Sequence, residues 1–369
     1  MSAEHPALRD LAHILESVRV GVYVVNRDRE IVFWNGGAQA ITGWTADAVI
    51  GTACHDSLLC HVDKDGRELC GDDTCPLLRA MVTGEASRDP VMVLAKTAEG
   101  ERVPVEVSVA PVRDDHGSIV GGVETFVDVR ERYEDLLRAQ RMQLASCTRS
   151  LKLAGPLSFE ALFSPHNLVG GDYLYAQALA QGGCAVFIAD VMGHGIAAGL
   201  HTAYLHGLCS EFSAIIDRPA EFLGRLNDRL CELLKVSESF ATALTAVFEP
   251  ASGTMRVASA GGPPPLLMSA DGGVAPVTCG GLPLGMMLSD SPEVVEHPME
   301  PGDVVVLCTD GLSEAVERNG SGDLAQVLAD LGYPAAEPGL AEVHRRALER
   351  SGEIRLPDDT TLVEVRYRR

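Results

Sequence analysis

The sequence predicts an α+β protein of two domains joined by a helix, and three observations lead to this prediction. The chain has 369 residues, which is long for one domain and sufficient for two. Strand-like runs dominate residues 1–128, whereas strands and helices alternate over residues 154–369. Between these parts, residues 129–153 are charged, contain neither Gly nor Pro, and favour a helix.

The composition excludes several classes of protein. A formal net charge of −22 argues against nucleic-acid binding, which relies on Lys and Arg to neutralise phosphates. No apolar run approaches the ~20 residues needed to cross a bilayer. Residues 1–6 lack a basic segment followed by an apolar stretch, so we expect no secretory signal. We therefore expect a cytoplasmic protein that binds neither nucleic acid nor membrane, with its ten cysteines mostly as thiols.

The N-terminal part begins with a short helix and continues with strands. An apolar face predicts the helix over residues 6–17. A second short helical stretch covers residues 34–44. Valine at every second position from Val103 to Val109 predicts a sheet with one buried face. The runs that read as strands are 18–26, 31–34, 90–97, 102–112 and 118–128.

Two phrases in this part are typical of one family. They are Gly-Val-Tyr-Val-Val-Asn at residues 21–26 and Phe-Trp-Asn-Gly-Gly-Ala at residues 33–38. With two strands, short helices and three antiparallel strands in this order, residues 8–128 resemble a PAS sensor domain. The resemblance implies a PAS fold, an antiparallel sheet with helices, for residues 1–128.

The segment of residues 129–153 carries a heptad pattern. Two sets of residues repeat every seven positions: Leu137, Leu144 and Leu151, and Tyr133, Gln140 and Cys147. About three heptads is the shortest run that predicts a coiled coil, which would make the protein a homodimer through this helix. The alternative is a solitary amphipathic linker helix. In either case, a helix between two domains is suited to passing a signal along its axis.

The C-terminal part reads as two sheets flanked by helices, an αββα sandwich. The expected strands are 184–189, 241–249, 254–259, 304–308 and 362–365. The expected helices are 196–215 and 219–235. The second and third strands read as a hairpin around Ala251-Ser252-Gly253.

Acidic residues stand at four places in this part, three of them beside apolar runs. They are Asp172, Asp190, Asp310 and the pair Asp358-Asp359. Strand ends can bring these side chains into one cleft, where carboxylates repel unless a cation lies between them. Hard divalent ions take oxygen ligands, and two of them about 4 Å apart can activate water for attack on phosphorus. Each motif alone is more often a simple turn, so only their combination predicts a metal-dependent hydrolase.

The order of the motifs resembles the SpoIIE-like branch of the PPM (protein phosphatase 2C-like) serine/threonine phosphatases. The resemblance covers residues 143–369, and we expect the domain to comprise residues 154–369. Its signatures are Gly170-Gly171-Asp172-Tyr173, Asp190 to Gly195, Ala241 to Leu244, Ala260-Gly261, Leu282 to Gly285, Thr309 to Ala315 and Asp358 to Leu362. The chain departs from the family pattern at Tyr175 and Gly262, and neither position is an expected ligand.

The resemblance implies a set of metal ligands and a reaction. Asp190 would bridge two Mn²⁺ or Mg²⁺ ions, and the carbonyl of Val191 would add to one of them. Asp310 and Asp358, the first residue of its pair, would hold the other ion. Asp172 would contact the centre directly or through water. His194 could assist proton transfer, although a His between two glycines more often shapes the turn before a helix.

The substrate that the resemblance implies is phosphoserine or phosphothreonine on a protein, in particular an anti-sigma-factor antagonist. The PAS domain would regulate this hydrolysis. A competing interpretation is a pseudo-phosphatase, or a redox-sensing dimeric module, that acts on its partner by binding alone. The four retained aspartates argue against the first of these.

Four cysteines form a separate cluster in the sensor domain, within residues 54–75. Cys54, Cys60, Cys70 and Cys75 have the spacing C-x5-C-x9-C-x4-C. Four thiolates in so short a segment could hold Zn²⁺ or an iron–sulfur cluster, with His55 and His61 as spare ligands. The spacing is not that of a standard zinc ribbon or ferredoxin. The alternatives are redox-active thiols or a loop without a special role.

Overall fold

The computed structural model describes residues 11–55, 58–71, 74–88, 90–148, 150–193, 195–237, 239–288, 292–318, 323–352, 356 and 358–368. The chain divides into two compact units, residues 1–135 and 136–369. The boundary falls inside one helix, α5 (Arg130–Ser146). Within the described ranges, no helix combines the length and the apolar character needed to span a membrane.

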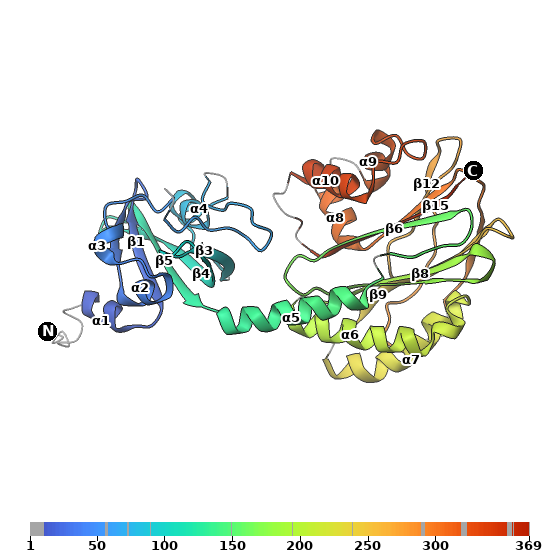
Figure 1. The fold of residues 1–369 in the computed structure, drawn as a ribbon, viewed down its shortest axis with the longest axis horizontal. Coiled ribbons are helices and arrows are strands. Elements are labelled where there is room, and N and C mark those ends of the chain that lie inside the picture. The colour runs from blue at the N-terminus through green and yellow to red at the C-terminus, as the bar shows by residue number, and fades with distance from the viewer. Residues whose placement is uncertain are drawn as a thin grey trace. The chain divides into compact units, whose positions relative to one another are not determined.

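The first unit is an antiparallel sheet with the strand order β2-β1-β5-β4-β3 (Figure 1). The pattern of strands and helices confirms the predicted fold. Its elements are α1 (Leu11–Ser17), β1 (Gly21–Asn26), β2 (Ile31–Trp34), α2 (Gly36–Thr42), α3 (Ala46–Val49), α4 (Pro76–Thr83), β3 (Val91–Lys96), β4 (Arg102–Arg113) and β5 (Ile119–Asp128).

The core of this unit forms because the strands alternate in burial. Val105 and Val107 of β4 are fully buried, whereas Glu106 between them is half-buried, as the period of two predicts. The rings of Tyr23, Trp34 and Phe126 meet at centroid distances of 5.7 to 6.4 Å. Such aromatic contacts add to the free energy gained from burying their large apolar surface.

Helix α5 is shorter than the helix predicted over residues 129–153, because it ends at Ser146. Beyond it, the backbone N–H of Thr148 donates a hydrogen bond to Leu174 O, at 3.0 Å. Leu151, the third leucine of the heptad pattern, packs against the core of the second unit instead of continuing a helix. A tertiary hydrogen bond and burial of apolar side chains thus override the local helix propensity.

The second unit is a sandwich of two five-stranded sheets with helices on both outer faces, as predicted (Figure 1). The strand orders are β13-β10-β9-β8-β7 and β12-β11-β14-β15-β6. The first sheet and its helices comprise β7 (Asp172–Ala178), β8 (Cys184–Val191), α6 (Ile196–Glu211), α7 (Pro219–Ser237), β9 (Ala241–Glu249), β10 (Thr254–Ala260) and β13 (Val295–Pro298). The second comprises β6 (Leu157–Ser164), β11 (Leu266–Met268), β12 (Val274–Pro276), β14 (Val304–Cys308), α8 (Asp310–Arg318), α9 (Leu324–Asp330), α10 (Leu340–Ser351) and β15 (Thr360–Tyr367).

The main core of this unit lies between the two sheets. Side chains from both sheets belong to one buried cluster, for example Ile188 of β8 and Val363 of β15. Phe187, the neighbour of Ile188 on the strand, points to the other face and packs edge-on against Phe222 of α7 at 5.6 Å. Strand β8 is buried on both faces, which explains why its sequence is apolar almost throughout.

Candidate functional site

The four acidic motifs meet at one edge of the sandwich. Strands β7 and β8 are antiparallel, so the first residue of β7 lies opposite the end of β8, and Asp172 is in register with Asp190. In the other sheet, Asp310 follows β14 and begins α8, while the pair Asp358-Asp359 precedes β15. The neighbouring strands β14 and β15 are also antiparallel, so these residues share an edge as well.

Asp190 lies at the centre of this carboxylate cluster, which we define as Asp172, Asp190, Asp310, Asp358 and Asp359. Burial raises the pKa of Asp190 to about 8, and repulsion from Asp310, Asp358 and Asp359 adds to the rise. The side chains of Asp190 and Asp310 are also hydrogen-bonded to each other. The pKa of Asp310 is also raised, by burial and then by the charges of Glu314 and Asp358. Negative charge thus gathers around Asp190 and Asp310.

Asp172 is enclosed by the fold, with 1% of its surface exposed. Its Oδ2 atom accepts hydrogen bonds from the hydroxyls of Thr309, at 2.8 Å, and Thr361, at 2.7 Å. Burial, followed by the charges of Asp190 and Asp359, raises the pKa of Asp172 well above its ordinary value. Asp172 therefore joins the two sheets beneath the cluster, a role that the sequence motif did not reveal.

The two members of the pair Asp358-Asp359 have different surroundings. Asp359 is 2% exposed, and its carboxylate accepts a hydrogen bond of 2.6 Å from each of two backbone N–H groups, those of His166 and Gly171. Asp358 is exposed and accepts from the N–H of Asp359, at 2.8 Å. Asp359 is thus occupied in holding two loops together. Asp358 has more of its carboxylate open, which favours the first residue of the pair as the ligand.

Gly170 and Gly171 have to be glycine because the chain passes close to its neighbours here. A Cβ atom at Gly170 would overlap the carboxylate of Asp359, and one at Gly171 would overlap the carbonyl oxygen of Val191. The N–H of Val191 donates to Gly171 O at 3.1 Å, which fixes the peptide next to the carbonyl of Val191. The Gly-Gly-Asp motif is therefore explained by close packing of the backbone as well as by its aspartate.

Gln143 of α5 also contacts this region, and nothing in the sequence distinguishes it from any other polar residue in a helix. Its side chain is buried and makes hydrogen bonds to both main-chain groups of Gly170. His194, which the sequence placed beside Asp190, lies outside the described residues.

The cluster fits divalent metal ions by its chemistry. Carboxylate and carbonyl oxygens are the donors that Mg²⁺ and Mn²⁺ prefer, and a cation would relieve the repulsion that raises the pKa of Asp190. Within the described ranges, no three His, Cys, Asp or Glu side chains stand around one point as ligands, either at this cluster or at the four cysteines of the sensor domain. Metal binding at the cluster would therefore require carboxylates to turn and to be deprotonated.

The four cysteines of the sensor domain have mixed environments. Cys54 and Cys75 are buried, and Cys60 and Cys70 are half-buried. The Sγ atom of Cys70 accepts a hydrogen bond of 3.1 Å from the N–H of His61. Burial, followed by the proximity of Cys75, raises the pKa of Cys54 to about 12. All ten cysteines are free thiols, so none of the four is tied up in a disulfide.

A buried polar group lies beside these thiols. Glu124 of β5 is 2% exposed, and burial raises its pKa to about 8. It accepts a hydrogen bond from Tyr23, while its Oε1 atom has no hydrogen-bond partner and lies 3.7 Å from Nε2 of His61. The charge of Glu124 also contributes to the raised pKa of Cys54. The sensor core therefore contains a polar cluster next to its cysteines.

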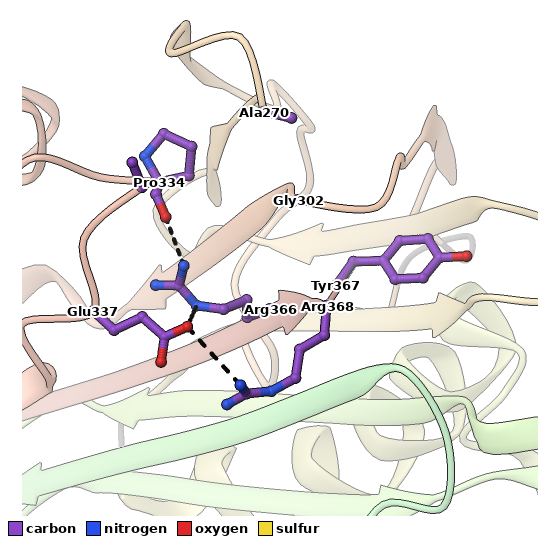
Figure 2. A pocket seen from close by; sticks show the side chains of 8 residues that line it. Ala270, Gly302, Pro334, Glu337, Arg366, Tyr367 and Arg368 are labelled. Atoms are coloured by element: carbon purple, nitrogen blue, oxygen red, sulfur yellow. Dashed lines mark hydrogen bonds and ion pairs between the residues drawn. The ribbon is translucent and has the colours of Figure 1, made fainter.

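Two pockets of the second unit differ in character. One, of about 520 Å³, is an apolar groove between α5 and α6 that is lined by Met142, Ile196 and Leu200 among others. The other, of about 480 Å³, contains Arg366 and Arg368 (Figure 2). Arg366 donates to Pro334 O at 2.6 Å and pairs with Glu337, which also pairs with Arg368 (Figure 2). Arg366 thus fastens the chain around Pro334 to β15.

Comparisons with known proteins agree with this architecture. The family model described as Stage II sporulation protein E (SpoIIE) matches residues 180–368, and the PAS fold model matches residues 15–134. Phosphoserine phosphatase RsbU of Bacillus subtilis (strain 168) is 26% identical over 214 residues, which cover 57% of this chain. The chain spans 63% of the length of that relative.

Two solved structures resemble the second unit in fold. The SiaA-PP2C domain of Pseudomonas aeruginosa has a TM-score of 0.55 at 21% identity, with 64% of this chain and 98% of that one covered. The RsbU and RsbW domains of Rv1364c from Mycobacterium tuberculosis give 0.51 at 23% identity, with 60% and 63% covered. The SpoIIE model covers just over half of the chain. The chain therefore belongs to the SpoIIE family, and its SpoIIE domain follows a PAS domain.

Proposed function

We propose that this protein is a sensor-regulated phosphatase that hydrolyses phosphoserine or phosphothreonine on another protein. The observation that carries the proposal is the proximity of Asp190 to Asp310 and Asp358, at the edge of a SpoIIE-family sandwich. The similarity to a phosphoserine phosphatase of Bacillus subtilis supports the same activity. The reaction needs no protein nucleophile, because water is the attacking group.

Two Mn²⁺ or Mg²⁺ ions would be held by this cluster. The residues that would hold them are Asp190, Asp310 and Asp358, together with the carbonyl of Val191. Asp172 would contribute directly or through water. When bound, the ions would lower the pKa of a coordinated water and neutralise the phosphoryl oxygens.

Other residues around the cluster hold its loops and carboxylates in place. Asp359 holds the N–H groups of His166 and Gly171 at 2.6 Å each, which sets the distance between two loops at the site. The hydroxyls of Thr309 and Thr361 fix the carboxylate of Asp172 from the other sheet. A preorganised site of this kind avoids the free-energy cost of ordering its groups during the reaction.

The substrate that we propose is a phosphorylated anti-sigma-factor antagonist in the cytoplasm, which would make the protein part of a partner-switching pathway. The similarity to RsbU supports this choice. The PAS domain would control the phosphatase through α5, with a homodimer formed along this helix. The alternative is a pseudo-phosphatase or redox-sensing dimeric module that acts by binding.

We also propose that Cys54, Cys60, Cys70 and Cys75 bind an iron–sulfur cluster or Zn²⁺ in the sensor domain. All four are free thiols, which supports the proposal. Elemental analysis and a visible spectrum of protein purified without oxygen test it. Iron together with absorbance at about 400 nm would indicate a cluster. Colourless protein that contains zinc would indicate a structural ion. Protein without metal would leave only the thiols as a redox sensor.

The decisive experiment on the phosphatase compares the wild-type protein with Asp190→Asn. We expect Mn²⁺-dependent release of phosphate from a phosphoserine peptide and from p-nitrophenyl phosphate, lost in the variant. The matched control is Asp330→Asn, because Asp330 is exposed and pairs with Arg350 on the surface. No Mn²⁺-dependent turnover by the wild-type protein, or equal turnover by Asp190→Asn, would refute the proposal.

A further inference from the structure

The pocket of about 480 Å³ in the second unit contains two arginines and lies away from the carboxylate cluster (Figure 2). Arg366 is near the end of β15 and Arg368 follows this strand, whereas Asp359 immediately precedes it. At roughly 3.3 Å per residue, Arg366 is on the order of 20 Å from Asp359 along the strand. A ligand in this pocket would therefore not touch the expected metal ions.

Arg366 is a buried cation whose guanidinium group is fixed from several sides. Only 8% of its side chain is exposed. Its Nε atom donates to Oε1 of Glu364 at 3.1 Å, Nη1 donates to Pro334 O at 2.6 Å, and Nη2 donates to Ala336 O at 3.2 Å. The group also stands over the ring of Tyr333, 5.7 Å from its centroid. A guanidinium has five N–H donors, and these bonds to described residues use three of them. Arg366 thus holds further N–H groups in a fixed orientation.

Two glutamates lie near Arg366, and they differ in their surroundings. Glu364 is buried, and its second oxygen, Oε2, accepts a hydrogen bond of 2.7 Å from the hydroxyl of Tyr333. It therefore balances the charge of Arg366 inside the fold. Glu337 is on the surface, with 57% of its side chain exposed. Its departure would not leave the buried arginine without a counter-charge.

One oxygen of Glu337 is shared by both arginines of the pocket (Figure 2). Oε1 lies 3.7 Å from Nε of Arg366 and 3.9 Å from Nη1 of Arg368, whose side chain is also 57% exposed. Both distances exceed the roughly 2.7–2.9 Å of a charge-assisted hydrogen bond. Exposed ion pairs of this kind contribute little to stability, so the carboxylate of Glu337 can be displaced at little cost.

We infer that this pocket binds an oxyanion from solution, a carboxylate or a phosphate group, in place of the Glu337 side chain. The carboxylate of Glu337 marks a position at which both arginines attract negative charge. A free anion is not tethered to the backbone, so it can approach within hydrogen-bond distance of Arg366 and Arg368, whose planar groups suit such ligands. This inference does not depend on the proposed function, because it concerns a different part of the domain.

The test measures anion binding by the full-length protein without divalent metal, so that no anion is held through metal ions. Equilibrium dialysis with radiolabelled inorganic phosphate, and separately with radiolabelled succinate, gives the dissociation constants. Glu337→Gln removes the competing carboxylate and keeps its size. Arg368→Gln removes one of the two cations. Arg366 is left unchanged because it also fastens the chain around Pro334.

The matched controls are Glu211→Gln and Arg229→Gln. These residues form an ion pair of 3.1 Å with exposed side chains on α6 and α7, and neither lines the pocket. The melting temperature of each metal-free protein shows whether it folds.

The two pocket variants should change anion affinity in opposite directions. We expect Glu337→Gln to bind the anion about threefold more tightly, because the anion no longer displaces an ion pair. We expect Arg368→Gln to bind it about tenfold more weakly, because a charge-assisted hydrogen bond is lost. Both controls should keep the affinity of the wild-type protein. Tighter binding of phosphate than of succinate, with the same pattern among the variants, would identify a phosphate group as the ligand, and the reverse a carboxylate.

Three results would overturn the inference. The first is the absence of saturable binding of both anions to the wild-type protein and to Glu337→Gln. The second is wild-type affinity in Arg368→Gln, or weaker binding by Glu337→Gln. The third is failure of either pocket variant to fold while both controls fold, which would make the ion pair purely structural. Failure of the proposed function would appear instead as a lack of Mn²⁺-dependent turnover, and it would leave these affinities unchanged.

Discussion

The hydroxyl of Thr361 donates a hydrogen bond of 2.7 Å to Oδ2 of Asp172, although the two residues belong to different sheets. Thr309 donates to the same oxygen, at 2.8 Å. Asp172 is thus both a member of the carboxylate cluster and a link between the halves of the sandwich. A change at any of these residues should therefore affect the fold and the site together.

The first prediction concerns this link between the sheets. Thr361→Val removes one donor from a buried carboxylate and preserves the shape of the side chain. We expect a loss of about 1–3 kcal/mol in the free energy of unfolding, since a buried acceptor loses a partner. Denaturant unfolding measures it. The control is Thr245→Val, because Oγ1 of Thr245 is buried without a partner, and its removal should cost nothing. Equal effects of the two substitutions would contradict the assigned role.

The second prediction separates the two residues of the pair Asp358-Asp359. Asp358→Asn should weaken Mn²⁺ binding at least tenfold and leave the melting temperature of the metal-free protein unchanged. Asp359→Asn replaces an acceptor of two backbone N–H groups with an amide that offers one acceptor atom. It should lower the melting temperature without metal. Calorimetry and thermal unfolding measure both, and the reverse pattern would assign the metal to Asp359.

The third prediction concerns the need for glycine at residue 171. Gly171→Ala forces a Cβ atom against the carbonyl oxygen of Val191, so we expect a loss of about 1–3 kcal/mol in stability together with loss of turnover. Gly207→Ala is the control, because Gly207 lies in α6 with open space where a Cβ would be. Alanine there should stabilise the helix by about 1 kcal/mol. A fully active Gly171→Ala protein would show that the backbone at this point can shift freely.

The fourth prediction is a pH dependence in the sensor domain. Burial raises the pKa of Glu124 from its ordinary 4.5 to about 8, so the folded domain keeps a proton that the unfolded chain has released. Its stability should therefore fall as the pH rises through this window, by up to about 1.4 kcal/mol per pH unit. Burial lowers the pKa of His61 from its ordinary 6.5 to about 4. This residue therefore has the opposite effect on the pH dependence of stability, but only at pH values below 6.5.

Urea unfolding at pH values between about 6.5 and 8 tests this dependence. Tryptophan fluorescence follows the sensor domain alone, because Trp34 and Trp44 are the two tryptophans of the chain. In Glu124→Gln the slope should disappear, since glutamine does not titrate. The exposed Glu101 provides the control Glu101→Gln, which should keep the slope of the wild-type protein. If the stability of Glu124→Gln depended on pH as strongly as that of the wild-type protein, a residue other than Glu124 would be the titrating group.

Regular elements could be predicted from the sequence because their patterns are local. The alternating valines of β4 predict a strand with one buried face, and the apolar runs of β8 and β14 predict strands with two. The end of α5 could not be predicted in this way. The residues after Ser146 favour a helix, and a contact between Thr148 and Leu174 decides against it.

The same difference between local patterns and distant contacts applies to the candidate site. The aspartates could be placed together because strand ends that share an edge bring distant residues close. The roles of Asp172, Asp359 and Gln143 could not be predicted, because they depend on hydrogen bonds to partners up to 193 residues away. Nothing in the local sequence distinguishes a carboxylate that binds metal from one that holds a loop.

The hydrogen bonds of Asp172 to Thr309 and Thr361 have a consequence for recombining this domain with that of a relative. A crossover between the two halves takes the aspartate from one parent and the two threonines from the other. Such a chimera retains a satisfied carboxylate only when the second parent also supplies both hydroxyls, so compatibility of parents can be judged at these three positions before any hybrid gene is made.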